Sequence, residues 1–132
     1  MNPRSKRVLI VDDDIDLLQL VCFLLDRINV ETVTAKNAAD AAKILREPPL
    51  PDLVILDLML PGISGMEFLR QMRARAVFDQ LPVLVLSALI DPKQIREALD
   101  SGADRYLTKP YIANNLLTVA QEMLRTGRRV ER

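Results

Sequence analysis

Short apolar runs alternate with longer amphipathic stretches along the whole chain. Most of these runs are rich in valine, isoleucine and leucine, and they predict five β-strands, at residues 7–11, 30–35, 53–56, 81–86 and, briefly, 105–108; the first is expected to be buried. After each run, apolar residues recur at intervals of three and four, which predicts a helix behind each strand. Five strand-helix units with short connections indicate an α/β fold with a parallel sheet covered by helices on both faces.

Capping residues mark several of the expected helix boundaries. Asp14 is the predicted N-cap of the first helix, Asn37 caps a second helix that runs to about residue 46, and Asp91 with Pro92 opens the fourth. The first helix is expected to turn one apolar face toward the core, made of Leu17, Leu20, Val21, Leu24, Leu25 and Ile28.

Polar side chains stand where the predicted strands end. Asp12 and Asp13 follow the first strand, Asp57 the third, Ser87 the fourth and Lys109 the fifth. In open parallel sheets, ligands bind beyond the carboxyl ends of the strands, where the strand order reverses. We therefore expect these side chains to converge on one rim of the sheet.

Composition narrows the chemistry that this rim can perform. The 132 residues fit one domain with a single core. Eighteen basic and eighteen acidic residues balance, so no net field attracts nucleic acid or a membrane surface. The lack of histidine excludes His-ligated zinc and Ser-His-Asp catalysis. A single cysteine, Cys22, and the lack of an apolar signal segment favour a cytoplasmic location.

The three acids of the rim point to metal-assisted phosphoryl transfer. Neighbouring carboxylates repel one another unless a cation neutralises them, and oxygen-only ligands favour Mg²⁺, with Mn²⁺ as the alternative. Asp57, on the central strand, is placed to attack phosphorus, while Lys109 and the Ser87 hydroxyl hold the transferred oxygens. Taken singly, each residue also has an ordinary interpretation as a helix cap, a turn residue or a solvated charge.

Four motifs, in a characteristic order, identify a family resemblance. They are VLIVDDD at 8–14, VILDLMLPGISG at 54–65, VLVLSA at 83–88 and DRYLTKP at 104–110. Over residues 6–126 the chain resembles the receiver domains of two-component response regulators. The resemblance implies a flavodoxin-like, doubly wound five-stranded parallel sheet in the order 2-1-3-4-5 with five helices. We expect residues 1–126 to form the receiver domain and residues 127–132 to be a charged tail or the start of a linker.

The resemblance assigns roles to the acidic residues. Asp57 looks like the phosphoacceptor, and Asp13 and Asp57 are expected to coordinate Mg²⁺ directly. Asp12 is expected to act through water, and the backbone carbonyl of Met59 completes the protein ligands.

The resemblance also assigns Ser87 and Tyr106 to a conformational switch that responds to phosphorylation. Ser87 and Lys109 match the hydroxyl and the amine that hold the phosphoryl oxygens, and Tyr106 matches the aromatic residue that turns inward when the hydroxyl moves. Without the motif, Tyr106 would read as a half-buried sheet tyrosine. The Lys109-Pro110 peptide bond is expected to be cis. Phosphorylation would then shift an existing equilibrium between two packings of residues 87–111.

Partners follow from the same resemblance. The phosphodonor is expected to be a sensor histidine kinase or a histidine phosphotransfer protein, and the output an unidentified partner or domain. A phosphorylation-dependent dimer is a further expectation. On the first helix, Ile15, Leu18 and Cys22 form a second apolar stripe off the predicted core face, which favours either a docking surface for the donor or burial under neighbouring loops.

Two other functions compete with the receiver interpretation. An aspartate-nucleophile phosphatase would place a second acid two residues after the nucleophile, where this chain has Met59. An interaction module that works unphosphorylated would not need the full set of acids, hydroxyl and lysine. Met59 and Leu89 offer the hydrolytic water no polar side chain, so slow self-dephosphorylation is expected, with no other enzymatic activity.

Overall fold

The strands of this protein form one parallel sheet. The structure is a computed structural model that describes residues 5–109 and 112–128. Its strands are β1 (Arg7–Val11), β2 (Glu31–Ala35), β3 (Leu53–Leu56), β4 (Val83–Ser87) and β5 (Arg105–Thr108). Its helices are α1 (Ile15–Asp26), α2 (Ala38–Arg46), α3 (Gly65–Arg73), the short 3₁₀ helix η1 (Ala76–Phe78), α4 (Pro92–Asp100) and α5 (Ile112–Thr126).

The predicted strand order is confirmed. The sheet runs β2-β1-β3-β4-β5, and all neighbouring strands are parallel. At the carboxyl end the register pairs Val11 with Leu56, and Ser87 with Thr108. Because these paired positions lie level across the sheet, the residues that follow them emerge along one rim.

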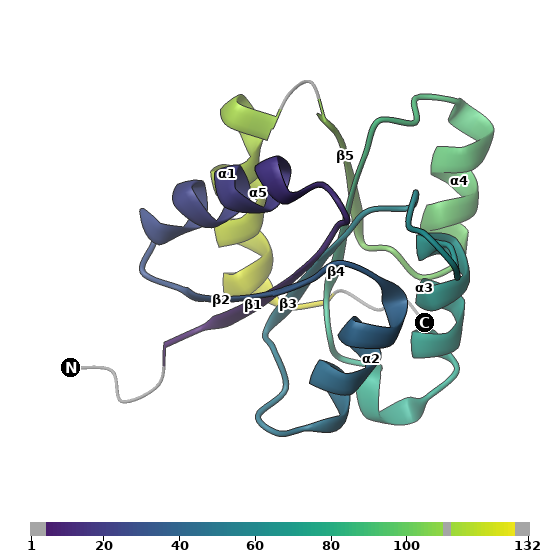
Figure 1. Cartoon of the computed structure of the whole chain (residues 1–132), viewed down its shortest axis with the longest axis horizontal. Coiled ribbons are helices and arrows are strands. Elements are labelled where there is room, and N and C mark those ends of the chain that lie inside the picture. Colours follow the sequence, from purple (N-terminus) through teal and green to yellow (C-terminus); the bar gives the residue numbers. More distant parts are fainter. Residues whose placement is uncertain (1–4, 110–111, 129–132) are drawn as a thin grey trace.

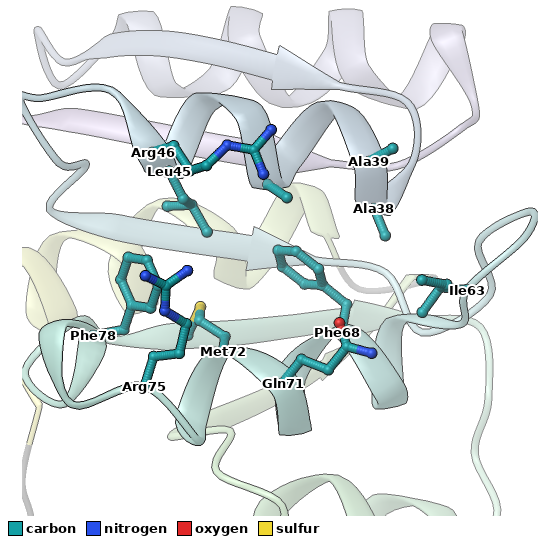
Figure 2. Close-up of a pocket in the computed structure, with 11 residues that line it drawn as sticks. Ala38, Ala39, Leu45, Arg46, Ile63, Phe68, Gln71, Met72, Arg75 and Phe78 are labelled. Carbon is teal, nitrogen blue, oxygen red and sulfur yellow. The ribbon is translucent and has the colours of Figure 1, made fainter.

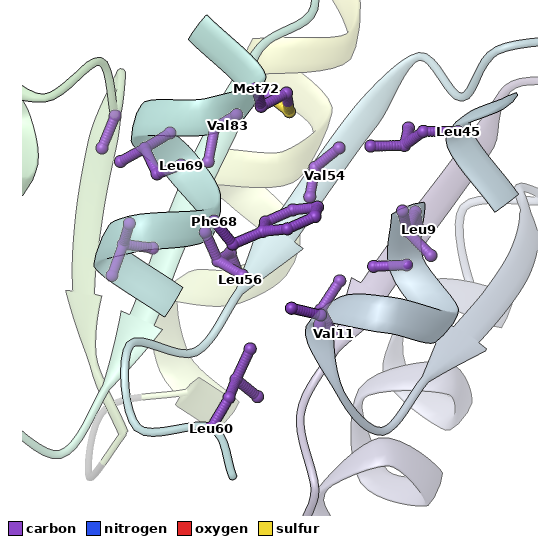
Figure 3. Packing of buried hydrophobic residues seen from close by; sticks show 14 of the residues in the cluster. Leu9, Val11, Leu45, Val54, Leu56, Leu60, Phe68, Leu69, Met72 and Val83 are labelled. Atoms are coloured by element: carbon purple, nitrogen blue, oxygen red, sulfur yellow. The ribbon is translucent and has the colours of Figure 1, made fainter. Parts of the chain in front are cut away.

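Helices cover both faces of the sheet. α1 and α5 lie on one face, and α2, α3 and α4 lie on the other (Figure 1). The α1-α5 face buries a cluster that includes Ile10, Leu25 and Leu116. On the opposite face, Phe68 of α3 points into the space between α2 and α3 (Figure 2), and it packs with strand residues such as Val54 (Figure 3). β1 and β3 are almost completely buried because both of their faces are covered.

The predicted helix caps are confirmed. The carboxylate of Asp14 accepts a hydrogen bond from the Leu17 amide at 3.2 Å, and the side chain of Asn37 accepts one at 2.8 Å from the Asp40 amide. Asp91 caps α4 with Pro92 in the first turn. These bonds satisfy amides that the first turn of a helix leaves unpaired.

The core face of α1 differs from the prediction. Leu18 is buried at 5% exposure and packs with Val21 and Leu25, whereas Leu20 is 43% exposed. Apolar residues occupy so many positions of this helix that two overlapping faces satisfy the same spacing, and packing in one buried cluster with residues of β1 and α5 selects the face through Leu18. The stripe of Ile15, Leu18 and Cys22 is therefore not a continuous surface.

Three strand boundaries and one short helix also differ from the prediction, and β2 begins at Glu31, one residue later than expected. β4 begins at Val83 and includes Ser87, because the segment before it forms η1 and then turns into the sheet. Phe78 and Leu81 anchor this segment, because both are buried in the same hydrophobic cluster as Phe68 and Val54.

No helix in residues 5–109 and 112–128 is long and apolar enough to span a bilayer.

A charged cluster closes the amino-terminal end of the sheet. Asp104 lies between two guanidinium groups, Arg73 at 3.2 Å and Arg128 at 2.9 Å, and it also accepts a hydrogen bond from the Val83 amide at 2.8 Å. Arg73 donates further bonds to the carbonyls of Gly102 and Phe78. Burial and the neighbouring Arg128 lower the pKa of Arg73 to about 10, against the opposing effect of Asp104. The cluster joins α3, β4, β5 and the end of α5.

Candidate functional site

Backbone hydrogen bonds place the two buried acids at the carboxyl rim. The Asp57 amide donates to the Val11 carbonyl at 3.0 Å, and the Asp12 amide donates to the Ala35 carbonyl at 3.0 Å. Each acid therefore continues the hydrogen bonding of the sheet by one residue. Asp12 and Asp57 are only 2% and 3% exposed.

Three carboxylates come together at this rim. One oxygen from each of Asp12, Asp13 and Asp57 lies within 4.8 Å of the other two. Asp13 is exposed, so it forms the solvent side of the group. The second residue after each buried acid holds it in place, since the Asp14 amide donates to Asp12 at 2.9 Å and the Met59 amide donates to Asp57 at 3.1 Å.

Lys109 supplies the positive charge of the site. Its Nζ lies 3.2 Å from Oδ2 of Asp12 and 3.2 Å from Oδ2 of Asp57. Burial opposes the charged amine, but the carboxylates of Asp57 and Asp12 outweigh that effect and raise the pKa of Lys109. The amine therefore stays protonated at neutral pH.

The rim holds more negative charge than one amine can balance. Burial raises the pKa of Asp12, and the nearby Asp57 carboxylate adds to this shift, while the Asp14 amide and Lys109 oppose it. Mg²⁺ holds its oxygen ligands about 2.1 Å away, so ligand oxygens around one ion stand about 3–4 Å apart. The carboxylate group fits such an ion with a small closing movement. Its all-oxygen donor set also suits Mg²⁺ or Mn²⁺ better than a softer metal.

Ser87 and Tyr106 form a second, linked part of the site. Ser87 is fully buried at the end of β4, and its hydroxyl accepts a hydrogen bond from the Leu89 amide at 3.2 Å. The Tyr106 hydroxyl donates to the Leu89 carbonyl at 2.8 Å. Burial raises the pKa of Tyr106, and an interaction with the Ser87 hydroxyl partly opposes the shift. The loop after β4 is thus held from both sides.

The remaining predicted residues lie in different settings. The Met59 side chain is 58% exposed and its amide holds Asp57, while a metal-binding role for its carbonyl stays a prediction. Ile15 is 51% exposed beside the acidic loop, Cys22 is half-buried, and Leu18 belongs to the core. A docking role for Leu18 is therefore wrong, because a side chain packed against the sheet cannot reach a partner. The expected cis bond involves Pro110, which lies outside the described residues.

Gly65 has a positional role that sequence reasoning missed. A Cβ atom at this position would lie 2.0 Å from the Asp57 carbonyl oxygen and 2.6 Å from the Leu58 Cα. The Gly65 amide also donates to the Leu58 carbonyl at 2.9 Å. The start of α3 thus packs directly on the backbone of Asp57, and any side chain would push the two apart. A glycine at the first position of a helix, just after the loop of Asp57, was the available signal.

Comparison with known proteins identifies the family. Residues 8–121 match the response regulator receiver domain family. The chain is 34% identical over 121 residues to the phosphate regulon transcriptional regulatory protein PhoB of Klebsiella pneumoniae, covering 92% of this chain and 52% of that protein. The chain thus spans about half the length of the curated relatives that it matches.

Solved structures agree with the sequence comparison. The BeF₃-activated N-terminal receiver domain of Klebsiella pneumoniae RstA superposes with a TM-score of 0.82 and 30% identity, covering 92% of this chain and all of that one. The chemotaxis response regulator CheY4 of Vibrio cholerae gives a TM-score of 0.83 and 28% identity, covering 90% and 98% of the two chains. The chain therefore belongs to the receiver domains of two-component response regulators.

Proposed function

We propose that Asp57 is the residue of this receiver domain that accepts a phosphoryl group. The observation that carries the proposal is its setting: a buried carboxylate whose Oδ2 lies 3.2 Å from the Lys109 amine and which shares its site with Asp12 and Asp13. A fixed ammonium beside a nucleophile stabilises the charge that develops on the transferred oxygens.

The reaction is an in-line displacement at phosphorus. A carboxylate oxygen of Asp57 forms a bond to phosphorus as the bond between phosphorus and the leaving group breaks, and the electron pair departs with that group. With a phosphohistidine donor the P–N bond breaks and the imidazole takes up a proton, whereas with acetyl phosphate the leaving group is acetate. The product is an aspartyl phosphate.

Mg²⁺ is the proposed cofactor, with Mn²⁺ as a substitute. The ion would neutralise the negative charge of the incoming phosphoryl oxygens and of the acids around them. Asp13 and Asp57 would bind it directly, the backbone carbonyl of Met59 would add a ligand, and Asp12 would act through water. Lys109 and Ser87 then hold the phosphoryl oxygens.

Ser87 and Tyr106 are proposed as the switch that follows phosphorylation. Both side chains contact the backbone of Leu89, so a movement of the Ser87 hydroxyl toward a phosphoryl oxygen would be felt by the phenol through the same residue. A modest preference of the phosphorylated form for one packing of this region is enough to shift its population.

The proposed donor is a sensor histidine kinase or a histidine phosphotransfer protein in the cytoplasm. Exposed Ile15, which directly follows the acidic loop, is a candidate contact for it, with half-buried Cys22 farther along the same helix. The receiver is proposed to occupy residues 1–126 and to act on an output partner or domain, with dimerisation as one route. Residues 127–132 would form a tail or linker.

Intact-mass measurement tests the acceptor directly. With acetyl phosphate and Mg²⁺ we expect the protein to gain one phosphoryl group, and Asp57→Asn to gain none. Asp52→Asn, an aspartate at the opposite end of β3, is the control and should react like the native protein. Phosphorylation of Asp57→Asn to the native extent, or reaction unaffected by chelating Mg²⁺, would contradict the proposal.

The lifetime of the aspartyl phosphate distinguishes a receiver domain from a phosphatase. Since neither Met59 nor Leu89 carries a polar side-chain group to orient water, the aspartyl phosphate should persist for minutes or longer after the donor is removed. Loss of the added mass within seconds would favour the phosphatase interpretation.

A further inference from the structure

A groove between α2 and α3 lies apart from the acidic rim. Its floor is apolar and is formed by Leu45, Phe68, Met72 and Phe78, and three alanines of α2 give part of its wall only small side chains (Figure 2). The cavity measures about 170 Å³. At one end is Ile63, from the loop that follows Asp57, with its side chain 48% exposed.

The size of this α2-α3 groove suits one large apolar side chain. Cavities that bind drug-sized molecules typically measure about 300–1,000 Å³, whereas an apolar cavity of about 150 Å³ holds a group the size of benzene. A protein partner that inserts a single leucine or phenylalanine would therefore fill the groove. The alanine wall admits such a side chain without displacing any bulky residue of α2.

Two arginines give the rim of the groove its charge. Arg46 ends α2 and Arg75 follows α3, and both side chains line the groove and are exposed. Neither forms an ion pair within the described part of the chain. The Arg75 guanidinium lies over the Phe78 ring at 5.7 Å, which holds it beside the apolar floor (Figure 2). The nearby acid Glu67 is already engaged by Arg70 and by Gln71.

We propose that the α2-α3 groove docks an acidic amphipathic helical segment of a partner protein. One large apolar side chain of this segment inserts between α2 and α3, and acidic residues on either side of it pair with Arg46 and Arg75. An amphipathic helix binds a groove through apolar anchor residues, and charges complementary to those of the groove add specificity and fix its orientation. This surface is separate from the phosphoryl site, and its binding is tested without phosphorylation.

Peptide selection followed by binding measurements tests the proposal. A displayed library of helical peptides is selected on the full chain, with counter-selection on the double variant Arg46→Glu/Arg75→Glu. Enriched peptides should carry a leucine, phenylalanine or methionine flanked by Asp or Glu. A synthetic peptide should bind saturably, shift the amide resonances of α2 and α3, and bind about tenfold more weakly to the double variant.

Matched controls separate the site from general charge effects. Arg27→Glu/Arg96→Glu makes the same change in net charge at exposed arginines elsewhere, one of which also lies over a phenylalanine ring, and should leave peptide binding unchanged. Replacing the apolar anchor of the peptide by serine should abolish binding.

Several outcomes would overturn the proposal. These are enrichment without acidic residues, equal binding to both double variants, or resonance shifts outside α2 and α3. Octanoate that occupies the groove where no peptide binds would indicate a site for small amphiphiles instead. Acetyl phosphate labelling of the groove variants should match the native protein, so failure here is distinguishable from failure of the phosphoacceptor assignment.

Discussion

The two ends of the β-sheet both gather charged side chains, but they balance them in opposite ways. At the carboxyl rim, three aspartates lie together, and one amine pairs with the two of them that are almost completely buried. At the amino end, a single carboxylate, Asp104, lies between two arginines. Other donors of those arginines go to the backbone carbonyls of Gly102, Phe78 and Asp79.

The difference separates charges that are paired within the fold from charges that are left in excess at the proposed site. The amino-end cluster joins several elements through bonds that are complete within the protein, so it stabilises the fold. The carboxyl rim keeps an excess of negative charge in a buried place, which folding alone would not favour. This excess is what the proposed Mg²⁺ site would neutralise.

Removing Asp104 should have the largest effect on stability. In Asp104→Ala, Arg73 stays largely buried without its carboxylate, so we expect the free energy of unfolding to fall by about 3 kcal/mol. Urea unfolding measures this, with Asp52→Ala as a control at the same end. Asp52 accepts only the Arg7 amide, at 2.8 Å, and its loss should cost about 1 kcal/mol. Equal losses of unfolding free energy in the two variants would show that pairing with the arginines does not make Asp104 more important for stability than Asp52.

Magnesium should stabilise the native protein by a smaller amount. An ion that binds only the folded state adds about 1.4 kcal/mol at ten times its Kd. Thermal unfolding with Mg²⁺, compared with a chelator at equal ionic strength, measures the gain. Asp13→Ala should lose it, whereas Asp104→Ala should keep it. A similar gain in Asp13→Ala would mean that the ion binds elsewhere.

Asp12→Asn should stabilise the protein in metal-free buffer at neutral pH, by on the order of 1 kcal/mol. Folding raises the pKa of Asp12 above its ordinary value of 3.8, so its charged form costs stability at higher pH. That cost fades as the pH falls through the raised pKa toward 3.8. The advantage of the variant should therefore shrink between pH 7 and pH 4 in urea unfolding. A constant or growing advantage would contradict this explanation.

Exposed ion pairs should matter least. The side chains of Arg70 and Glu97 form an ion pair, yet they are 46% and 49% exposed. Solvent screens such pairs, so Arg70→Gln should lower the free energy of unfolding by no more than about 0.5 kcal/mol. A double-mutant cycle with Glu97→Gln isolates the pair. A coupling free energy between Arg70 and Glu97 as large as the loss in Asp104→Ala would contradict the claim that buried charge pairs contribute more to stability than exposed ones.

The sequence alone predicted most of the fold and the membership of the rim. The bounds of β1, β3 and β5 agree with the structure; for β1 and β3 the reason is an apolar run between clear turn signals, and β5 is bounded by the glycine-containing turn before it and by Lys109-Pro110 after it. The predicted core face of α1 was wrong, because leucine occupies positions on both sides of that helix. The Asp104 cluster and the contact of Gly65 with Asp57 join residues far apart on the chain or depend on backbone proximity, which no local pattern encodes.

The bond from Tyr106 to the Leu89 carbonyl also makes the protein its own optical reporter. The chain has no tryptophan and only two tyrosines, Tyr106 and Tyr111. Near-ultraviolet absorbance and emission therefore come from very few chromophores, and one of them donates a hydrogen bond from its phenol to the loop beside the proposed phosphoryl site. Replacing Tyr111 by phenylalanine would leave a single tyrosine signal for following this region in real time without any attached dye.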